Sequence, residues 1–216
     1  MSTSTPKRIV FDFGGVVFRW RPAVLIRQVW PHHAPDQDRA EHWVQQVFQG
    51  YTGDWGEFDR GTVDAPELAR RIAARTGLTE TELHQLIEAA PAELAPIPAS
   101  VDLLERLHAR GATLHYLSNM PAPFAAHLSR SHGFMQRFRS GVYSSRVQLI
   151  KPDPAIFAHA AAHFGAEPDE LVFLDDHPPN IAAARAAGWQ GIHFQDAAQA
   201  EREIRAAGWW PQPGTA

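Results

Sequence analysis

The most informative segment of the chain is Arg8-Ile-Val-Phe-Asp-Phe-Gly-Gly-Val-Val17. Its β-branched and aromatic residues predict a strand that is buried on both faces. The apolar run is interrupted by Asp12, and two glycines follow it closely. Glycines let the backbone turn tightly and let a ligand approach. Because open α/β sheets bind ligands at the carboxyl ends of parallel strands, we expect Asp12 to lie in a ligand site.

Composition limits the classes of protein that this chain can represent. Its 216 residues suffice for one large domain, or for a core with a smaller insertion. The formal net charge is −4 and no lysine/arginine block occurs, which argues against a nucleic-acid partner. The sequence contains no cysteine, which excludes disulfides, thiolate catalysis and cysteine zinc sites.

The sequence also carries no sign of a membrane or export signal. Residues 1–6 are polar and lack the apolar stretch of a signal peptide. No apolar run approaches the length of a membrane span. We therefore expect a cytoplasmic protein without membrane association, and the sequence leaves a monomer and a homodimer equally open.

From about residue 98 onward, strand-like and helix-like segments alternate. The strand-like segments are Thr113–Ser118, Ser140–Tyr143, Leu171–Asp175 and Gly191–Phe194. The helix-like segments are Val101–Arg110, Pro154–Phe164, Asn180–Ala187 and Ala197–Ala207. This alternation predicts right-handed βαβ units. The fold class is therefore α/β, a three-layer Rossmann-like core with a central parallel sheet.

The segment 19–98 has a different pattern, without a convincing strand. Its predicted helices are Ala23–Trp30, Gln37–Phe48, Pro66–Thr76 and Thr79–Ala90. We expect a glycine- and aromatic-rich loop over Gly50–Phe58, and we expect Pro91, Pro96 and Pro98 to end the helical segment. The predicted organisation is a core of residues 1–18 and 99–216, with a helical cap, 19–98, inserted after the first strand. The tryptophans of the tail, Trp209 and Trp210, either pack onto the core or fray with the terminus.

Polar residues recur at the ends of the predicted strands or in the loops that follow. They are Asp12, Ser118, Asn119, Lys151, Asp175 and Asp176, with His177 next along the chain. The set supplies a nucleophile, a hydroxyl, an ammonium group and paired carboxylates suited to a hard cation. Phosphoryl transfer needs these groups, because it is catalysed mainly by positioning and by electrostatic stabilisation.

Four motifs occur in order: FDFGG (11–15), LSN (117–119), KPDP (151–154) and FLDD (173–176). In this order they resemble the haloacid dehalogenase superfamily of phosphatases, and the helical insertion resembles the cap of its dehalogenase-like subfamily. Within it, FDFGGVV, Asp59-Arg-Gly61, LSNM and FLDDHPPNI resemble the bacterial α-D-glucose-1-phosphate phosphatase branch. The chain is also similar to the N-terminal phosphatase domain of soluble epoxide hydrolase.

The resemblance implies a role for each motif. Asp12 would be the nucleophile of an enzyme that hydrolyses a small phosphomonoester through an aspartyl-phosphate. Mg²⁺ would be bound by Asp12, the main-chain carbonyl of Gly14, and one or both of Asp175 and Asp176. The phosphate would be held by Ser118, Asn119 and Lys151.

One position departs from the family pattern. Most of these phosphatases carry a second aspartate two residues after the nucleophile, where this chain has Gly14. That aspartate protonates the leaving group, and such acid/base help is typically worth about 10²–10⁴-fold. Its absence favours esters with easily displaced leaving groups, namely an anomeric (sugar 1-) phosphate, an acyl phosphate or an aryl phosphate. His177 or a histidine of the cap are candidate replacements.

Several alternatives stay open at this point. In the cap, Trp55, Phe58 and Arg60 either face the substrate or serve packing and ion pairing. The pair His32-His33 lacks further metal ligands at suitable spacing. Three other functions compete with the phosphatase: a metal-independent dehalogenase, a phospho-acceptor domain of the receiver type, and a pseudo-phosphatase that has kept only binding.

Overall fold

The computed structural model describes residues 8–211 and has a five-stranded parallel sheet at its centre. The strands are β1 (Arg8–Phe11), β2 (Thr113–Ser118), β3 (Ser140–Tyr143), β4 (Leu171–Asp175) and β5 (Gln190–His193). Their order in the sheet is β3-β2-β1-β4-β5. The strand that carries Asp12 beyond its end is therefore central, and Phe11 is level with Tyr116 on one side and Leu174 on the other.

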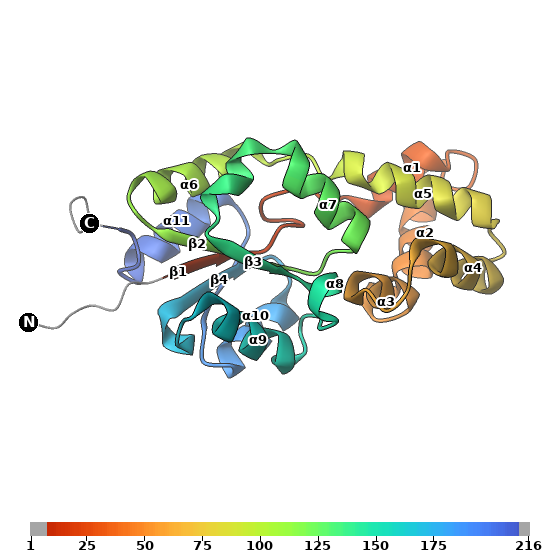
Figure 1. Ribbon diagram of the computed structural model, residues 1–216. Coiled ribbons are helices and arrows are strands. Elements are labelled where there is room, and N and C mark those ends of the chain that lie inside the picture. Colours follow the sequence, from red (N-terminus) through yellow and green to blue (C-terminus); the bar gives the residue numbers. More distant parts are fainter. Residues whose placement is uncertain (1–7, 212–216) are drawn as a thin grey trace, which may run out of the picture.

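Helices cover both faces of the sheet and complete three layers (Figure 1). They are α6 (Pro98–Ala109), α7 (Ala122–Ser131), α9 (Pro154–Phe164), α10 (Pro178–Ala186) and α11 (Ala197–Ala206). The short helix α8 (Ser144–Val147) directly follows the carboxyl end of β3. Successive residues of a strand point to opposite faces. Accordingly, Ile9 and Phe11 join the apolar cluster that includes α6, α7 and α11, while Val10 joins the cluster of α9 and α10. The predicted α/β fold is confirmed.

The first strand is shorter than its apolar sequence. It ends at Phe11, and the chain then folds into a turn in which the carbonyl of Phe13 accepts the N–H groups of Val16, Val17 and Phe18. The apolar side chains of this turn, those of Phe13, Val16, Val17 and Phe18, are fully buried. Asp12 is the polar residue of this segment, and it directly follows the carboxyl end of the strand.

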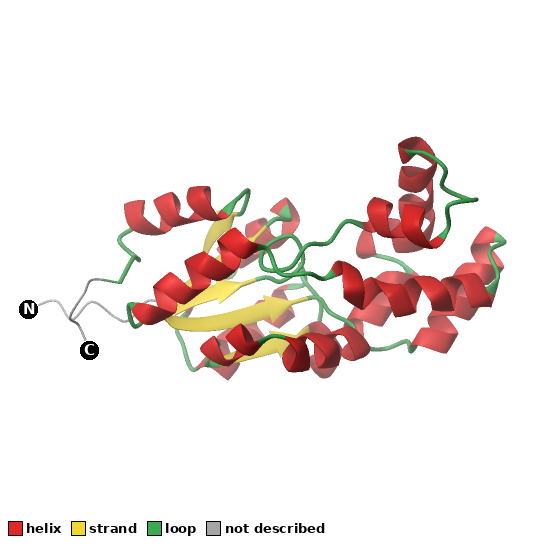
Figure 2. Cartoon of the chain, turned by 90° about the horizontal axis from the view of Figure 1, so that it is seen from above, coloured by secondary structure: helices red, strands yellow, loops and turns green. Residues whose placement is uncertain are grey.

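Residues 22–93 contain five α-helices and no strand, and we call them the helical lobe. The helices are α1 (Pro22–Val29), α2 (Gln37–Phe48), α3 (Asp54–Arg60), α4 (Ala65–Thr76) and α5 (Glu80–Glu93). Figures 1 and 2 show the lobe beyond the carboxyl ends of the strands, to which the arrows in Figure 2 point. The helical lobe is therefore placed to face any site at the strand ends.

The structure corrects two expectations about the helices and adds one helix. Much of the expected loop Gly50–Phe58 lies in α3, because Trp55 and Phe58 are both buried and pack on Phe48 and Phe124. Pro91 does not end a helix but lies inside α5, which continues to Glu93. Helix α7 follows β2, where no helix range was predicted, and Pro123 in its first turn favours the helix start.

The carboxyl end of the described chain is packed onto the core. Trp209 and Trp210 are buried, so the packing alternative for the tail is confirmed up to residue 211. The rest of the tail, 212–216, and the polar segment 1–6 lie outside the described residues.

Short 3₁₀ helices occur at Gln49–Tyr51, Gly133–Arg137 and Pro168–Glu170. Within residues 8–211, no helix is long and apolar enough to cross a membrane.

Candidate active site

A cavity of about 470 Å³ lies between the carboxyl ends of the strands and the helical lobe. From the core it is lined by Asp12, Gly14, Asn119, Lys151, Asp176, His177 and Asn180. From the lobe and its two connections to the core it is lined by Trp20, Tyr51, Trp55, Asp59 and Leu94, among others. The structure thus brings most of the predicted site residues together in one place.

Lys151 lies between two carboxylates at the base of this cavity. Its Nζ is 2.9 Å from Oδ1 of Asp12 and 2.6 Å from Oδ2 of Asp175, and the lysine and Asp175 side chains are 1% and 0% exposed. Asp12 is held because its N–H donates to the carbonyl of Leu174 beyond the end of β1. The pair Asp12–Lys151 is therefore a fixed, desolvated ion pair at the strand ends.

Asn119 positions Lys151 from the loop after β2. Its Oδ1 accepts the backbone N–H of Lys151 at 2.9 Å, and its Nδ2 donates to the Lys151 carbonyl at 3.0 Å. Both ends of the amide are therefore engaged with the main chain of Lys151. This finding adds to the predicted phosphate-binding role a second one, which is to hold the lysine in place.

Ser118, the last residue of β2, is 1% exposed, and its hydroxyl has no hydrogen-bond partner among residues 8–211. An unpaired buried hydroxyl costs free energy. An anionic ligand at the strand ends is a chemically suitable acceptor for it.

The paired acids of β4 have different environments. Asp175 accepts hydrogen bonds from the N–H of His177 and the side chain of Asn180, in addition to Lys151. Asp176 is exposed and lines the cavity. One carboxylate oxygen from each of Asp12, Asp175 and Asp176 lies within 4.8 Å of the others. Three hard oxygen donors of this kind fit Mg²⁺.

The charges of the site are not balanced by protein groups alone. Burial raises the pKa of Asp12 to about 7; Lys151 opposes this, and Asp175 and Asp176 raise it further. Asp176 is exposed as a residue, but partial desolvation of its carboxyl group and the charge of Asp175 likewise raise its pKa, and Lys151 opposes this. Burial lowers the pKa of Lys151, but the charges of Asp12 and Asp175 outweigh it and the net shift is upward. The acids outnumber the ammonium group, so a bound cation would stabilise their ionised forms.

The two glycines after Asp12 differ in what they require. Gly14 lines the cavity, and a Cβ added there would have Cβ of Trp20 as its nearest neighbour at 3.7 Å, so the space accepts a side chain. Gly15 has φ +74°, and a Cβ would lie 2.1 Å from Oδ2 of Asp176. Gly15 is therefore needed for the close approach of Asp176, whereas crowding does not explain the glycine at position 14.

This contact leads to a prediction for Gly15→Ala. We expect the methyl group to displace the Asp176 carboxylate and to reduce Mg²⁺ affinity at least about 10-fold, equivalent to about 1.4 kcal/mol. Isothermal titration with Mg²⁺ measures this. Gly77→Ala is the matched control, because Gly77 has a similar φ of +79° and no atom near its Cβ position. Both variants share the backbone strain, so equal loss of Mg²⁺ affinity in the two would contradict the role of Gly15.

The remaining candidates are residues of the helical lobe and histidines, and some of them line the cavity while others only pack or form ion pairs. Phe58 is buried and Arg60 pairs with Glu57 at 3.6 Å, as expected for packing and ion pairing. Trp55 is buried and also lines the cavity. His177 lines the cavity at the start of α10. His33 is bonded to Glu82 at 2.7 Å, and no metal-ligand cluster within 8–211 includes it.

Sequence reasoning missed several residues of the cavity, among them Trp20, Tyr51 and Asp59. Trp20 donates from Nε1 to the hydroxyl of Tyr51 at 2.7 Å, and both line the cavity. Asp59 also lines it and is only 6% exposed. The available signal is the Asp59-Arg-Gly61 motif, which contributes to the family resemblance without indicating a role for its acid.

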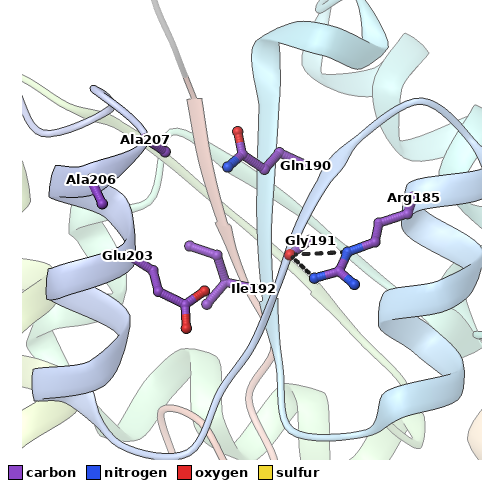
Figure 3. A pocket seen from close by; sticks show the side chains of 7 residues that line it. All are labelled: Arg185, Gln190, Gly191, Ile192, Glu203, Ala206 and Ala207. Carbon is purple, nitrogen blue, oxygen red and sulfur yellow. Dashed lines mark hydrogen bonds between the residues drawn. The ribbon is translucent and has the colours of Figure 1, made fainter.

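A second hollow of similar size, about 460 Å³, lies between α10, β5 and α11 (Figure 3). Figure 3 shows that the guanidinium of Arg185 is engaged with the carbonyl of Gly191, at 2.7 Å from Nη2. The other lining residues are Gln190, Ile192, Glu203, Ala206 and Ala207. This hollow brings together no nucleophile and no acid cluster, so size alone does not make it a candidate site.

The fold and the cavity together have the features of an α/β enzyme that binds an anionic substrate beside a divalent cation. Residues 6–188 match the family of haloacid dehalogenase-like hydrolases. Because this match covers most of the chain, the protein belongs to the haloacid dehalogenase-like hydrolase family.

Individual relatives agree with this assignment. The chain is 26% identical over 203 residues to the sesquiterpene phosphatase AstK of Aspergillus oryzae, covering 94% of this chain and 96% of the relative. It is 33% identical over 95 residues to phosphoglycolate phosphatase of Escherichia coli, covering 44% and 38% of the two chains.

Two solved structures share the fold. A haloacid dehalogenase-family enzyme of Bacteroides thetaiotaomicron, in complex with magnesium and inorganic phosphate, has a TM-score of 0.69 at 20% identity, covering 89% of this chain and 96% of that chain. L-2-haloacid dehalogenase of Xanthobacter autotrophicus has a TM-score of 0.65 at 17% identity, covering 94% and 83%.

Proposed function

We propose that this protein is a Mg²⁺-dependent phosphatase that hydrolyses a small phosphomonoester through an aspartyl-phosphate on Asp12. The observation that carries the proposal is the Asp12 carboxylate, which is buried beside Lys151 and within reach of two further acids. Relatives that are named as phosphatases support it. A structural neighbour in complex with magnesium and inorganic phosphate supports it as well.

The residues of the site divide the work as follows. Mg²⁺ would be held by Asp12, Asp176, Asp175 and the carbonyl of Gly14, and would offset the repulsion between the carboxylates and the phosphate. Lys151 and the unpaired hydroxyl of Ser118 hold phosphate oxygens. Asp12 attacks phosphorus from the sheet side, so the leaving group departs toward the helical lobe.

We further propose that the helical lobe acts as a cap. In this division residues 1–18 and 99–216 form the catalytic core and 19–98 form the cap, which excludes water and selects the substrate. The lobe supports this role because Tyr51, Trp55 and Asp59 line the cavity opposite the acids of the core.

The walls of the cavity favour a substrate with an apolar body. Outside the acidic base, the lining includes Trp20, Tyr51, Trp55, Leu94, Met120, Pro121 and Phe124. A sugar ring needs several hydrogen-bonding partners, whereas these walls offer mainly aromatic and aliphatic surface. A phosphate ester of an apolar alcohol or a phenol therefore fits better than the sugar 1-phosphate that the resemblance implies. The similarity to a sesquiterpene phosphatase supports this choice.

The test is a substrate panel measured with Mg²⁺ and with EDTA. The panel contains a prenyl phosphate, an aryl phosphate, glucose 1-phosphate and a 2-haloacid. We expect Mg²⁺-dependent phosphate release, with kcat/KM for the prenyl and aryl esters at least about 10-fold above that for the sugar ester. Preference for glucose 1-phosphate would contradict the apolar assignment. Halide release with EDTA, or inertness toward all phosphates, would contradict the phosphatase itself.

A further inference from the structure

The helical lobe places one carboxyl group in the cavity, that of Asp59 in α3. The residue is 6% exposed and lines the same cavity as Asp12 and Lys151. It is the acid that the lobe contributes to the lining, while the other lining acids, Asp12 and Asp176, belong to the core. The base of the site and its roof therefore both carry carboxyl groups.

We propose that Asp59 is the general acid of the reaction, replacing the acid that is missing at Gly14. The inference rests on the proposed phosphatase function and extends it. An ester oxygen displaced by Asp12 leaves on the side of phosphorus opposite the nucleophile, which is the side of the helical lobe. A proton donor on the lobe therefore lies on the side of the leaving oxygen and needs no side chain at position 14.

The main chain around Asp59 is fixed to the core. The hydroxyl of Ser144 donates to the Asp59 carbonyl and accepts the N–H of Met120 at 2.8 Å. Gly61, with φ +81°, allows the close contact, because a Cβ there would lie 2.5 Å from the carbonyl of Ser145. Helix α3 is thus tied to α8 and to the loop after β2, and α3 and α8 lie side by side in Figure 1.

In contrast to the main chain of Asp59, its carboxyl group makes no interaction that holds the structure together within the described residues. No hydrogen bond or ion pair to the Asp59 carboxyl group occurs within the described part of the chain. The hydrogen bond from Ser144 is to the main-chain carbonyl of Asp59. Burial raises the pKa of Asp59 well above 3.8; the charge of Asp12 adds to this and that of Lys151 opposes it. A buried carboxyl without a partner costs stability. Its neutral form is the form that a general acid needs.

Neighbouring groups explain less well how the proton is delivered. Burial raises the pKa of Tyr51 to about 12, and its hydroxyl already accepts from Trp20. His177 lies on the core at the start of α10, beside the acids rather than on the lobe.

The proposed cycle balances its protons. In the first step Asp12 forms a bond to phosphorus, the bond to the ester oxygen breaks, and the proton of Asp59 moves to that oxygen. In the second step water attacks the aspartyl-phosphate and gives a proton to the Asp59 carboxylate. The bond from phosphorus to Asp12 breaks, so phosphate leaves and Asp59 is protonated again.

The experiment compares Asp59→Asn with wild type on two esters in the presence of Mg²⁺. The parameter kcat/KM reports on events up to leaving-group departure. We expect it to fall about 10²–10³-fold for an alkyl phosphate, which needs the acid, and less than about 5-fold for 4-nitrophenyl phosphate, which does not. Hydrolysis of the phosphoenzyme is also slowed, so the variant should release nitrophenol in a burst of about one equivalent. Glu57→Gln, which alters an acid on the same helix that does not line the cavity, is the control, with both esters unchanged.

Other outcomes would overturn the inference. An equal loss for the two esters would make Asp59 a structural residue, and no loss would remove it from the reaction. We expect thermal unfolding of Asp59→Asn at or above the wild-type temperature; if that variant does not fold, Asp59→Ala provides the same comparison. Wild type without Mg²⁺-dependent turnover would instead refute the phosphatase, so the two failures are distinct.

Discussion

Asp12→Asn is expected to lower kcat for every accepted phosphate ester at least about 10³-fold, because the amide cannot serve as the nucleophile and the remaining groups only bind and orient the substrate. The substitution is nearly isosteric, and the Asp12 side chain is 11% exposed, so the cavity should keep its shape. Steady-state phosphate release with saturating Mg²⁺ measures the effect.

The same variant separates a nucleophile from a mere metal ligand. If Asp12 only bound the cation, raising the Mg²⁺ concentration would restore turnover of Asp12→Asn. We expect no such rescue. We also expect mass spectrometry of acid-quenched wild type to find phosphate on the peptide that contains Asp12. Asp102→Asn, which alters an acid that is 67% exposed on α6, should retain full activity.

The second large effect concerns stability, and it follows from the burial of Lys151. Lys151→Met leaves Asp12 and Asp175 in a desolvated site without their shared ammonium group. Removing one partner of a buried ion pair typically costs about 3–5 kcal/mol. Hydrogen bonds from His177 and Asn180 to Asp175 limit the loss, so we expect about 3 kcal/mol in the free energy of unfolding. Denaturant unfolding in EDTA measures it.

Magnesium should partly reverse this loss, because a cation among the acids replaces the missing positive charge. We therefore expect Mg²⁺ to stabilise Lys151→Met more than wild type, while the variant remains inactive for want of a phosphate ligand. Arg70→Met removes an exposed ion pair with Glu67 and should leave unfolding unchanged. A similarly small effect for Lys151→Met would show that its ion pairs do not hold the site together.

Local patterns predicted the regular elements well where the pattern was long and continuous. The strand limits Thr113–Ser118 and Leu171–Asp175 and the helix Gln37–Phe48 agree with the structure. Prediction was wrong where composition and packing conflicted. The glycines between residues 50 and 56 indicated a loop, but burial of Trp55 and Phe58 against Phe48 and Phe124 stabilises α3 there. Tertiary packing outweighed local propensity in this segment.

The residues of the candidate site likewise divide into those that local sequence patterns predicted and those that only tertiary packing revealed. Asp12, Ser118, Asp175 and Asp176 were recognisable because each lies at a strand end, and parallel strands bring those ends to one edge. Asp59 gave no such signal, since it lies on a helix of the lobe and its importance depends on which cavity it faces. The pairing of Asn119 with the main chain of Lys151, 32 residues away, was equally invisible in the order of residues.

The order and type of residues were enough to predict the parallel α/β architecture, the chemical groups available at the strand ends, and the absence of an acid at Gly14. These properties depend on residue type and on short-range periodicity. The three-dimensional packing was needed to see that Lys151 lies between Asp12 and Asp175 and that Gly15 admits Asp176. It was also needed to see that Asp59 lines the cavity without a side-chain partner among the described residues. Charge interaction and desolvation depend on distance and burial in three dimensions, and neither can be read from position along the chain.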